Sequence, residues 1–218
     1  MDHCVLSNGT VWLSAPTTND IDTITECCRE PSIGKWTTVP VPYERANAET
    51  FITDIVDPGW AGRSPTWAMR VRVDGPVIGM ISLAENDKSA AEIGFWLSPA
   101  HRSRGLTTQA VDLVCGFGFH TDGLHLTRIS WRAIVGNYAS AAVARRAGFR
   151  YEGRSRLGGV QRGERHDHWH AARLATDPPG PAMGWPVEFD HRHPTVTPQP
   201  SQRNQSVRNR RETDAPST

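Results

Sequence analysis

The sequence predicts a mixed α/β fold in which a central, mostly antiparallel sheet is flanked by helices. Apolar side chains alternate with alanine and arginine over residues 67–73, and this period of two is typical of a half-buried strand. The turn-forming run 74–76 leads into a second apolar stretch, 77–83, so the two stretches are expected to pair as a hairpin. Apolar residues recur at helical spacing in 21–28 and 51–56, which predicts amphipathic helices.

The N-terminal part of the chain is expected to hold one strand and two helices. The apolar run 11–13 predicts the strand. Pro31 is expected to stop the first helix, and 32–46 to form a loop. Asn47 is then the expected cap of the second helix, which Pro58-Gly59 would end.

The rest of the chain continues the alternation of strands and helices. The expected strands are 91–97, 126–133, 150–152 and 166–174, and the expected helices are 108–120 and 137–147. Asn137 is the expected cap of the last helix and Gly148 its expected C-terminal residue in the left-handed conformation. Four helices are therefore expected to lie on one central sheet.

Composition divides the chain into a domain, 1–175, and a tail, 176–218. Only 38% of the 218 residues are apolar, which indicates that some segment lies outside the core. Half of the sixteen prolines lie in the tail, and such composition buries too little apolar area to offset the entropy of ordering. The tail is therefore expected to be largely disordered. Trp185 and Phe189 are exceptions that could dock 183–190 onto the domain.

Charge and cysteine usage argue against several kinds of partner. A net charge of +1 gives no electrostatic argument for nucleic acid or an anionic membrane. The basic segment 203–211 is diluted by Glu212 and Asp214, so it is expected to be a solvated patch. No apolar stretch approaches the ~20 residues needed to span a bilayer. The four cysteines form no CxxC pattern, so reduced thiols in the cytoplasm are expected.

A turn at 101–108, His-Arg-Ser-Arg-Gly-Leu-Thr-Thr, carries the first chemical signal. A strand runs into it and a helix begins within it, so unpaired backbone N–H groups at the positive end of the helix dipole can bind phosphate. Gly105 allows the backbone to approach a ligand closely, and Arg102 and Arg104 add positive charge. An ordinary strand-to-helix connection has the same pattern, so the turn alone leaves both interpretations open.

A second motif, about thirty residues later, favours the phosphate-binding interpretation. It reads Asn137-Tyr138-Ala139-Ser140, in a helix that ends with Gly-Phe. Together the two motifs resemble those of the GNAT superfamily of N-acetyltransferases, in particular its RimJ/RimL-like branch, whose turn reads Arg-Gly-x-Gly-x-Ala. The segment Ala91–Leu97, AEIGFWL, looks like that branch too. The resemblance covers roughly 10–175 and implies that the central strands containing Glu92 and Trp131 splay apart to admit acyl-CoA.

Residues of both motifs are implied to bind acetyl-CoA, the acyl donor. They are Leu97, Arg102, Ser103, Arg104, Gly105, Leu106, Thr107, Asn137 and Ser140. Backbone amides of the turn would hold the pyrophosphate, and Asn137 would bond the pantetheine arm or its thioester end. Ser140 would protonate the departing thiolate. The chain departs from the family pattern at Ser103, where glycine is usual, and at Thr107, where alanine is usual. Both residues are small, so binding is expected to survive.

The resemblance also leaves the acid and the base of the reaction partly open. The position of a tyrosine that serves as the acid in many members is Ala144 here, which leaves Ser140 or Tyr138 for the role. Glu92 is the expected base, acting directly or through water on an acceptor amine that is mostly protonated at neutral pH. A structural carboxylate paired with arginine is the alternative for Glu92, and the pattern does not separate the two.

Three histidines form the last chemical pattern. His166, His168 and His170 alternate along an expected strand and therefore share one face. Imidazoles so arranged can ligate zinc, but no fourth ligand or cysteine pair accompanies them. We therefore favour solvated histidines or a lining of the acceptor cleft, and we expect no metal.

The implied function is transfer of an acetyl group from acetyl-CoA to a primary amine by direct attack in a ternary complex. The acceptor could be a protein N-terminus or a small molecule, and the residues do not distinguish them. The alternative is a non-catalytic, acyl-CoA-binding sensor or interaction module. A homodimer is left open.

Overall fold

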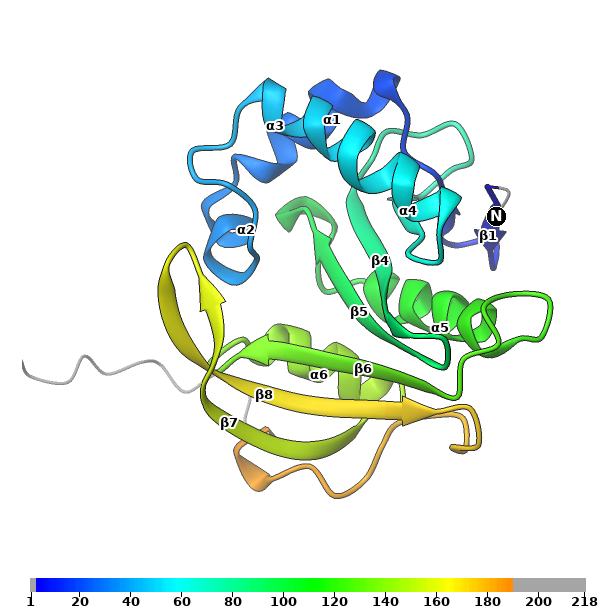
Figure 1. Cartoon of the computed structure of the whole chain (residues 1–218), viewed down its shortest axis with the longest axis vertical. Helices are drawn as coiled ribbons and strands as arrows, with labels where there is room; N and C mark the ends of the chain where they lie inside the picture. Colours follow the sequence, from blue (N-terminus) through cyan, green and yellow to red (C-terminus); the bar gives the residue numbers. More distant parts are fainter. Residues whose placement is uncertain (1–2, 190–218) are drawn as a thin grey trace, which may run out of the picture.

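An eight-stranded sheet in the order β1-β2-β3-β4-β5-β6-β8-β7 organises the chain. The computed structural model describes residues 3–189, and Figure 1 shows how its helices surround the sheet. The strands are β1 Leu6–Ser7, β2 Trp12–Ser14, β3 Thr66–Arg70, β4 Gly79–Asp87, β5 Ala90–Leu97, β6 Arg128–Ile134, β7 Arg150–Gln161 and β8 Glu164–Leu174. Every neighbouring pair is antiparallel except β5 and β6. The predicted mixed α/β fold with a mostly antiparallel sheet is therefore confirmed.

The helices form two groups along the chain. The first comprises the 3-10 turn η1 Thr18–Asp20, α1 Ile21–Cys28, α2 Pro31–Trp36, α3 Arg45–Thr50, the π-helix η2 Phe51–Val56 and α4 Asp57–Ala61. The second comprises η3 Pro99–His101, α5 Leu106–Phe119, α6 Tyr138–Arg146 and η4 Val187–Phe189. Helix α5 packs across β4, β5 and β6, and α6 packs against β6. Helices α1 to α4 lie together near β4 and β5 in Figure 1.

The expected loop at 32–46 is confirmed only over 37–44; its first part is wrong, because Pro31 starts a helix there. Pro31 is the first residue of α2, a position where the missing N–H costs nothing and the fixed φ suits the helix. Asn47 is not the cap of the next helix either. Glu44 is the cap, and its backbone N–H donates to Asn47 Oδ1 over 2.8 Å. The helical path then continues beyond Pro58, which lies in the first turn of α4.

Strand β3 is buried along its whole length, in contrast to the half-buried strand expected from its alternating pattern. Arg70 explains the misleading alternation, because it is buried although it is charged. Its guanidinium donates to both carboxylate oxygens of Asp20, at 2.9 and 2.8 Å, and its Nη1 donates to the carbonyl of Gly75. A buried charge needs such a partner. The ion pair joins the start of α1 to the end of β3.

The two parallel strands separate soon after they meet. Only three residue pairs join β5 to β6, ending at Glu92 and Ser130. Beyond that point β5 continues to Leu97 and β6 to Ile134 without pairing to each other. This divergence confirms the expected splay of the central strands and opens the sheet toward the helices α2 and α6.

The C-terminal strands extend well beyond the short ones expected at 150–152 and 166–174. They form a long hairpin, β7–β8, whose two-residue turn holds Arg162 and Gly163 at φ 46° and 84°. Two consecutive residues in the left-handed region favour a tight type I′ hairpin. The hairpin tip reaches toward α2 in Figure 1.

The chain after residue 175 packs onto the domain as far as the structure describes it. Ala182 and Trp185 are buried, and Trp185 Nε1 donates to the carbonyl of Phe149 over 2.8 Å. Phe189 packs edge-to-face against Trp169, with ring centroids 4.6 Å apart. The expected docking of Trp185 and Phe189 is thus seen, and 176–189 join the folded unit. The remainder of the expected tail, 190–218, lies outside the described residues.

Candidate functional site

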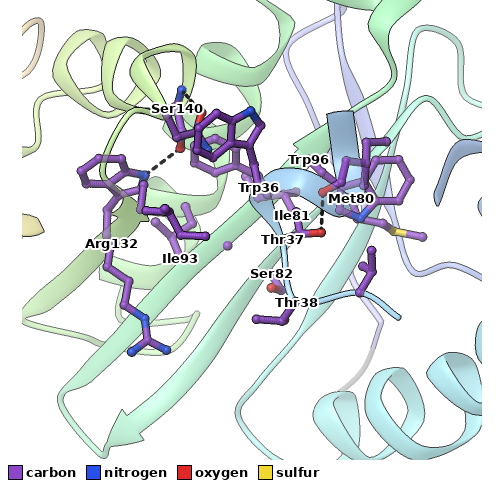
Figure 2. A pocket seen from close by; sticks show the side chains of 18 of the residues that line it. Trp36, Thr37, Thr38, Met80, Ile81, Ser82, Ile93, Trp96, Arg132 and Ser140 are labelled. Carbon is purple, nitrogen blue, oxygen red and sulfur yellow. Dashed lines mark hydrogen bonds between the residues drawn. The ribbon is translucent and has the colours of Figure 1, made fainter. Parts of the chain in front are cut away.

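A cavity of about 540 Å³ lies where β5 and β6 diverge. Its walls come from the separated parts of both strands, from α2 and the segment after it, from α6 and from the β7–β8 hairpin. Figure 2 shows side chains from these elements facing one another, among them Trp36, Ile93 and Ser140. Because the strands no longer satisfy each other's backbone groups there, a ligand can insert between them and bond to both.

The turn between β5 and α5 adopts the conformation that anion binding requires. Gly105 is the N-cap of α5 at φ 73°, and Ser103 has φ 61°. Within residues 3–189, no hydrogen bond uses the backbone N–H groups of 103–108. These six donors stand at the positive end of a fourteen-residue helix and can hold a phosphate or pyrophosphate.

Arg102 and Thr107 face the protein more than expected. Arg102 Nε donates to the carbonyl of Leu97 over 3.0 Å, and its Nη2 donates to Ser32 Oγ over 2.9 Å. It therefore ties the turn to β5 and to α2 while its side chain lines the cavity. Thr107 is buried, so its extra atoms relative to alanine point into the protein and leave the turn free.

Helix α6 presents Ser140 to the cavity. Asn137 caps the helix, as expected, because its Oδ1 accepts from the backbone N–H of Ser140 over 3.2 Å. The Ser140 hydroxyl oxygen accepts from Trp131 Nε1 over 3.0 Å, the dashed line beside Ser140 in Figure 2. Trp131 comes from the diverging part of β6. Both Asn137 and Ser140 line the cavity.

Glu92 lies at the point where the strands part, and it is paired with an arginine. Its Oε1 accepts from Arg132 Nε over 2.9 Å, and 30% of the Glu92 side chain is exposed. Both residues line the cavity. This geometry is the paired carboxylate that the sequence offered as an alternative, although Oε2 has no hydrogen-bond partner within residues 3–189.

The tip of the β7–β8 hairpin is hydrogen-bonded to the end of α2, beside the cavity. Gln161 Nε2 donates to the carbonyls of Lys35 and Thr37 over 3.1 and 2.5 Å, and Arg162 Nη2 donates to the carbonyl of Gly34 over 2.7 Å. These bonds occupy carbonyl groups at the end of a short helix, which otherwise lack partners. Trp36 and the residues after it are thereby held over the cavity.

Of the three alternating histidines, His168 lines the cavity. Burial, and then the charge of Arg132, lower the pKa of His168 below its ordinary value. Its Nδ1 is buried without a partner in the described part of the chain. His170 instead shares a 2.6 Å hydrogen bond with Ser155 Oγ. No group of three or more residues suited to a metal occurs among residues 3–189.

Comparison with known proteins assigns the chain to a family. Residues 10–150 match the family model described as the acetyltransferase (GNAT) domain. The chain belongs to the GNAT acetyltransferase family. The resemblance drawn from the turn and from the Asn137–Ser140 motif is therefore confirmed.

Curated relatives and solved structures of other acetyltransferases are similar to the chain. "Putative ribosomal N-acetyltransferase YdaF" of Bacillus subtilis is 38% identical over 96 residues, which are 43% of this chain and 51% of that protein. The chain thus spans about half the length of this curated relative. The ribosomal L7/L12 α-N-protein acetyltransferase RimL has a TM-score of 0.69 to 0.70 in its two matching crystal structures.

The solved structures establish the fold. The apo form of RimL is 18% identical and matches 80% of this chain and 96% of its own, with a TM-score of 0.70. The microcin C7 self-immunity acetyltransferase MccE, solved with acetyl-CoA and AMP, is 19% identical, with a TM-score of 0.69 over 77% of this chain and 93% of its own. Both structures therefore agree with the expected fold.

Of the residues that sequence reasoning found, Leu97, Arg102, Asn137, Ser140 and Glu92 line the cavity. The rest of the turn, 103–107, follows Arg102 but is not part of the lining, so its role stays a prediction. Sequence reasoning missed Trp131, Trp36 and Gln161 as parts of the site. Trp131 was recognised only as a marker of the splayed strand. The one signal available for Gln161 was its place directly before Arg162-Gly163, a pair that suits a tight hairpin turn.

Proposed function

We propose that this GNAT protein transfers an acetyl group from acetyl-CoA to a primary amine while both reactants are bound. One observation carries the proposal: the cavity between β5 and β6 has the Ser140 hydroxyl in its wall and is also lined by Arg102, directly before the unpaired N–H groups of 103–108. That combination suits a pyrophosphate joined by a narrow arm to a reactive thioester. Acetyl-CoA, as donor substrate, supplies the thioester carbonyl carbon.

The residues of the chain would divide the work of binding and proton transfer. The N–H groups of 103–108 bind the pyrophosphate, and Asn137 keeps its Nδ2 for the pantetheine arm because its Oδ1 caps α6. The acceptor nitrogen attacks the carbonyl carbon as the carbon–sulfur bond breaks. Ser140 gives the Oγ proton to the sulfur and regains a proton from water, and Glu92 or a water takes the proton lost by the amine. Holding both reactants in line supplies much of the acceleration.

We favour a polypeptide N-terminus as the acceptor. Ile55 and Val160 line the cavity and are 56% and 52% exposed, so its α2 side has an apolar, open rim. Such a rim suits the side chains of an extended peptide better than a polyamine, because Glu92, the acidic residue of the lining, is already paired with Arg132. The ribosomal acceptor in the name of the YdaF relative supports the same class.

A cytoplasmic location fits this acceptor. The four cysteines are free, and burial raises the pKa of both Cys28 and Cys115 to about 12, so these thiols stay protonated. None of the helices between residues 3 and 189 is long and apolar enough to cross a membrane.

Replacing Ser140 with alanine tests the proposal. We expect acetyl-CoA to raise the melting temperature of both the wild type and Ser140→Ala. Acetyl transfer to a peptide N-terminus, followed as release of free thiol, should fall at least about a hundredfold in the variant, the usual contribution of a general acid. Ser82→Ala is the matched control, because Ser82 lines the same cavity from β4 and has no assigned role.

Two results would contradict the proposal in different ways. Unchanged turnover in Ser140→Ala would remove Ser140 from the chemistry. If acetyl-CoA stabilises the wild type but no peptide or small amine releases thiol, the chain is an acyl-CoA-binding sensor. Faster turnover of small amines than of peptides would overturn the acceptor class alone.

A further inference from the structure

The hydroxyl group of Ser140 is held by an indole from the neighbouring strand. We propose that Trp131 is a positioning residue, whose Nε1–H fixes Ser140 Oγ so that the hydroxyl proton is aimed into the cavity. This inference rests on the proposed function, in which Ser140 protonates the departing thiolate.

The chemistry of the two groups determines which way the hydrogen bond runs. An indole Nε1–H can donate but cannot accept, whereas a serine hydroxyl has one proton and two lone pairs. At 3.0 Å the Trp131 nitrogen must therefore donate to Ser140 Oγ. The hydroxyl proton stays available, because no acceptor for it exists within residues 3–189. A ligand atom in the cavity is then the partner to which it can donate.

The hydrogen bonding of the Ser140 hydroxyl differs from that of most serines near the start of a helix. Such hydroxyls commonly bond a backbone group nearby, which would use the proton. In this chain the backbone N–H of Ser140 is already bonded to the Asn137 cap, and its oxygen is bonded to Trp131. The side chain is thus held at its oxygen and at its backbone while its proton stays free.

The indole is itself rigid enough to act as a fixed donor. Trp131 is 2% exposed, and its strand pairs with β8 through Ala171. Its ring lies 5.9 Å from the ring of Trp185, which is in turn bonded to the carbonyl of Phe149. Turning the indole away would leave its N–H buried without a partner, at a cost comparable to a lost hydrogen bond.

A free serine side chain can occupy three staggered rotamers, and a misplacement of about 1 Å in a catalytic group can cost up to a hundredfold in rate. Losing the indole donor should therefore affect the chemical step more than binding. We expect Trp131→Phe to lower kcat about tenfold, with the KM for acetyl-CoA unchanged.

A double-mutant cycle between Trp131→Phe and Ser140→Ala in the full chain is the decisive experiment. If Trp131 acts through Ser140, Trp131→Phe lowers kcat in the wild-type background and leaves it unchanged in Ser140→Ala, because groups that act as a unit are not additive. Trp169→Phe is the matched control. Trp169 is equally buried, on β8, and makes no hydrogen bond to Ser140.

A second variant covers the case in which Trp131→Phe fails to fold. Benzothienylalanine at position 131 replaces the N–H by sulfur in a ring of nearly the same shape, so it removes the donor without leaving a cavity. It should reproduce the loss in kcat with a wild-type melting temperature.

The outcomes separate this inference from the function on which it rests. Equal losses from Trp131→Phe in both backgrounds would show a merely structural role and overturn the inference. Full turnover in Trp131→Phe, with Ser140→Ala impaired, would overturn it as well and leave the proposed function standing. Full turnover in Ser140→Ala would overturn the inference and remove Ser140 from the chemistry, but acetyl transfer itself would stand.

Discussion

At the scale of single residues, the turn between β5 and α5 depends on two residues whose backbone is in the left-handed region. Gly105 has φ 73° and Ser103 has φ 61°, a region that costs a residue with a side chain about 1 to 2 kcal/mol. Serine therefore occupies a position that suits glycine, which explains why the family pattern has glycine there. The positive φ at both positions turns successive N–H groups of 103–108 toward one side, as in other anion-binding turns.

Replacing Gly105 with alanine should weaken this turn. A methyl group there would meet nothing closer than Gln109 Nε2 at 3.9 Å, so the cost comes from the backbone conformation alone. We expect Gly105→Ala to lower the free energy of unfolding by about 1 to 2 kcal/mol and to weaken acetyl-CoA binding. Urea unfolding and calorimetric titration measure the two effects.

Gly116→Ala is the control for that substitution. Gly116 lies within the same helix, α5, at a position exposed to solvent. A methyl group there would meet nothing within 4 Å. Alanine should stabilise that position by about 0.5 to 1 kcal/mol. If both variants changed stability in the same direction, the left-handed strain assigned to Gly105 would be wrong.

The residue types of the site could be predicted from the sequence only where a local rule governs them. Asn137 followed three residues later by Ser140 is a local capping pattern, and it holds in the structure. The partner of Ser140 is Trp131, nine residues earlier on a strand. The contact depends on the angle between β6 and α6, and the spacing of residues in the sequence does not predict that angle. The Glu92–Arg132 pair likewise depends on two strands that separate.

At the scale of elements, the predictions failed mainly where one residue has two possible roles. Proline ends a helix in its interior but suits its first turn, and Pro31 and Pro58 both take the second role. An arginine in an alternating pattern usually faces water, but Arg70 is buried against Asp20. Tertiary partners, absent from local sequence, decide each case.

The β7–β8 hairpin is the element that shapes the α2 side of the cavity. We expect Gln161→Ala to raise the KM for the acceptor about tenfold, since losing a buried hydrogen-bond donor costs about 1 to 2 kcal/mol. Gln161 is 8% exposed, and its Nε2 donates to the carbonyls of Lys35 and Thr37. These residues directly precede Thr38 and Val39, which line the cavity. The KM for acetyl-CoA should not change. Steady-state kinetics with each substrate varied in turn measure both values.

Gln109→Ala provides a matched control for the hairpin variant. Gln109 bonds Asn8 at an exposed site on α5 and does not line the cavity. It should leave both KM values unchanged. A rise in the acetyl-CoA KM of Gln161→Ala would show that the hairpin supports the donor side instead, and the assignment of the acceptor side would be wrong.

At the scale of the whole molecule, the folded unit includes a segment that composition placed outside it. Low apolar content was a valid argument for the average of 176–218, but Ala182, Trp185 and Phe189 are concentrated at its start. The two tryptophans Trp131 and Trp185 pack together. This segment therefore supports β6, the strand whose Trp131 donates a hydrogen bond to Ser140. The match to the family model ends at residue 150, before this segment begins.

Two truncated chains test that role. A chain ending at residue 175 loses Trp185 and Phe189, whose rings pack against Trp131 and Trp169. Deleting a single buried tryptophan side chain typically costs about 3 to 5 kcal/mol. We expect it to lose at least that much of its free energy of unfolding, and to lose turnover as Trp131 becomes mobile. A chain ending at residue 189 keeps every described contact of the segment, so its unfolding and kcat are the reference for the chain ending at 175.

The comparison of the two truncations separates packing from length. If the chain ending at 175 unfolds at the same urea concentration as the full chain, the segment is not part of the core. Trp185→Phe then refines the result, because it keeps a ring beside Trp131 but removes the bond to the Phe149 carbonyl. A kcat loss in Trp185→Phe that disappears in the Ser140→Ala background would show that the influence of the segment on turnover passes through Trp131 to Ser140.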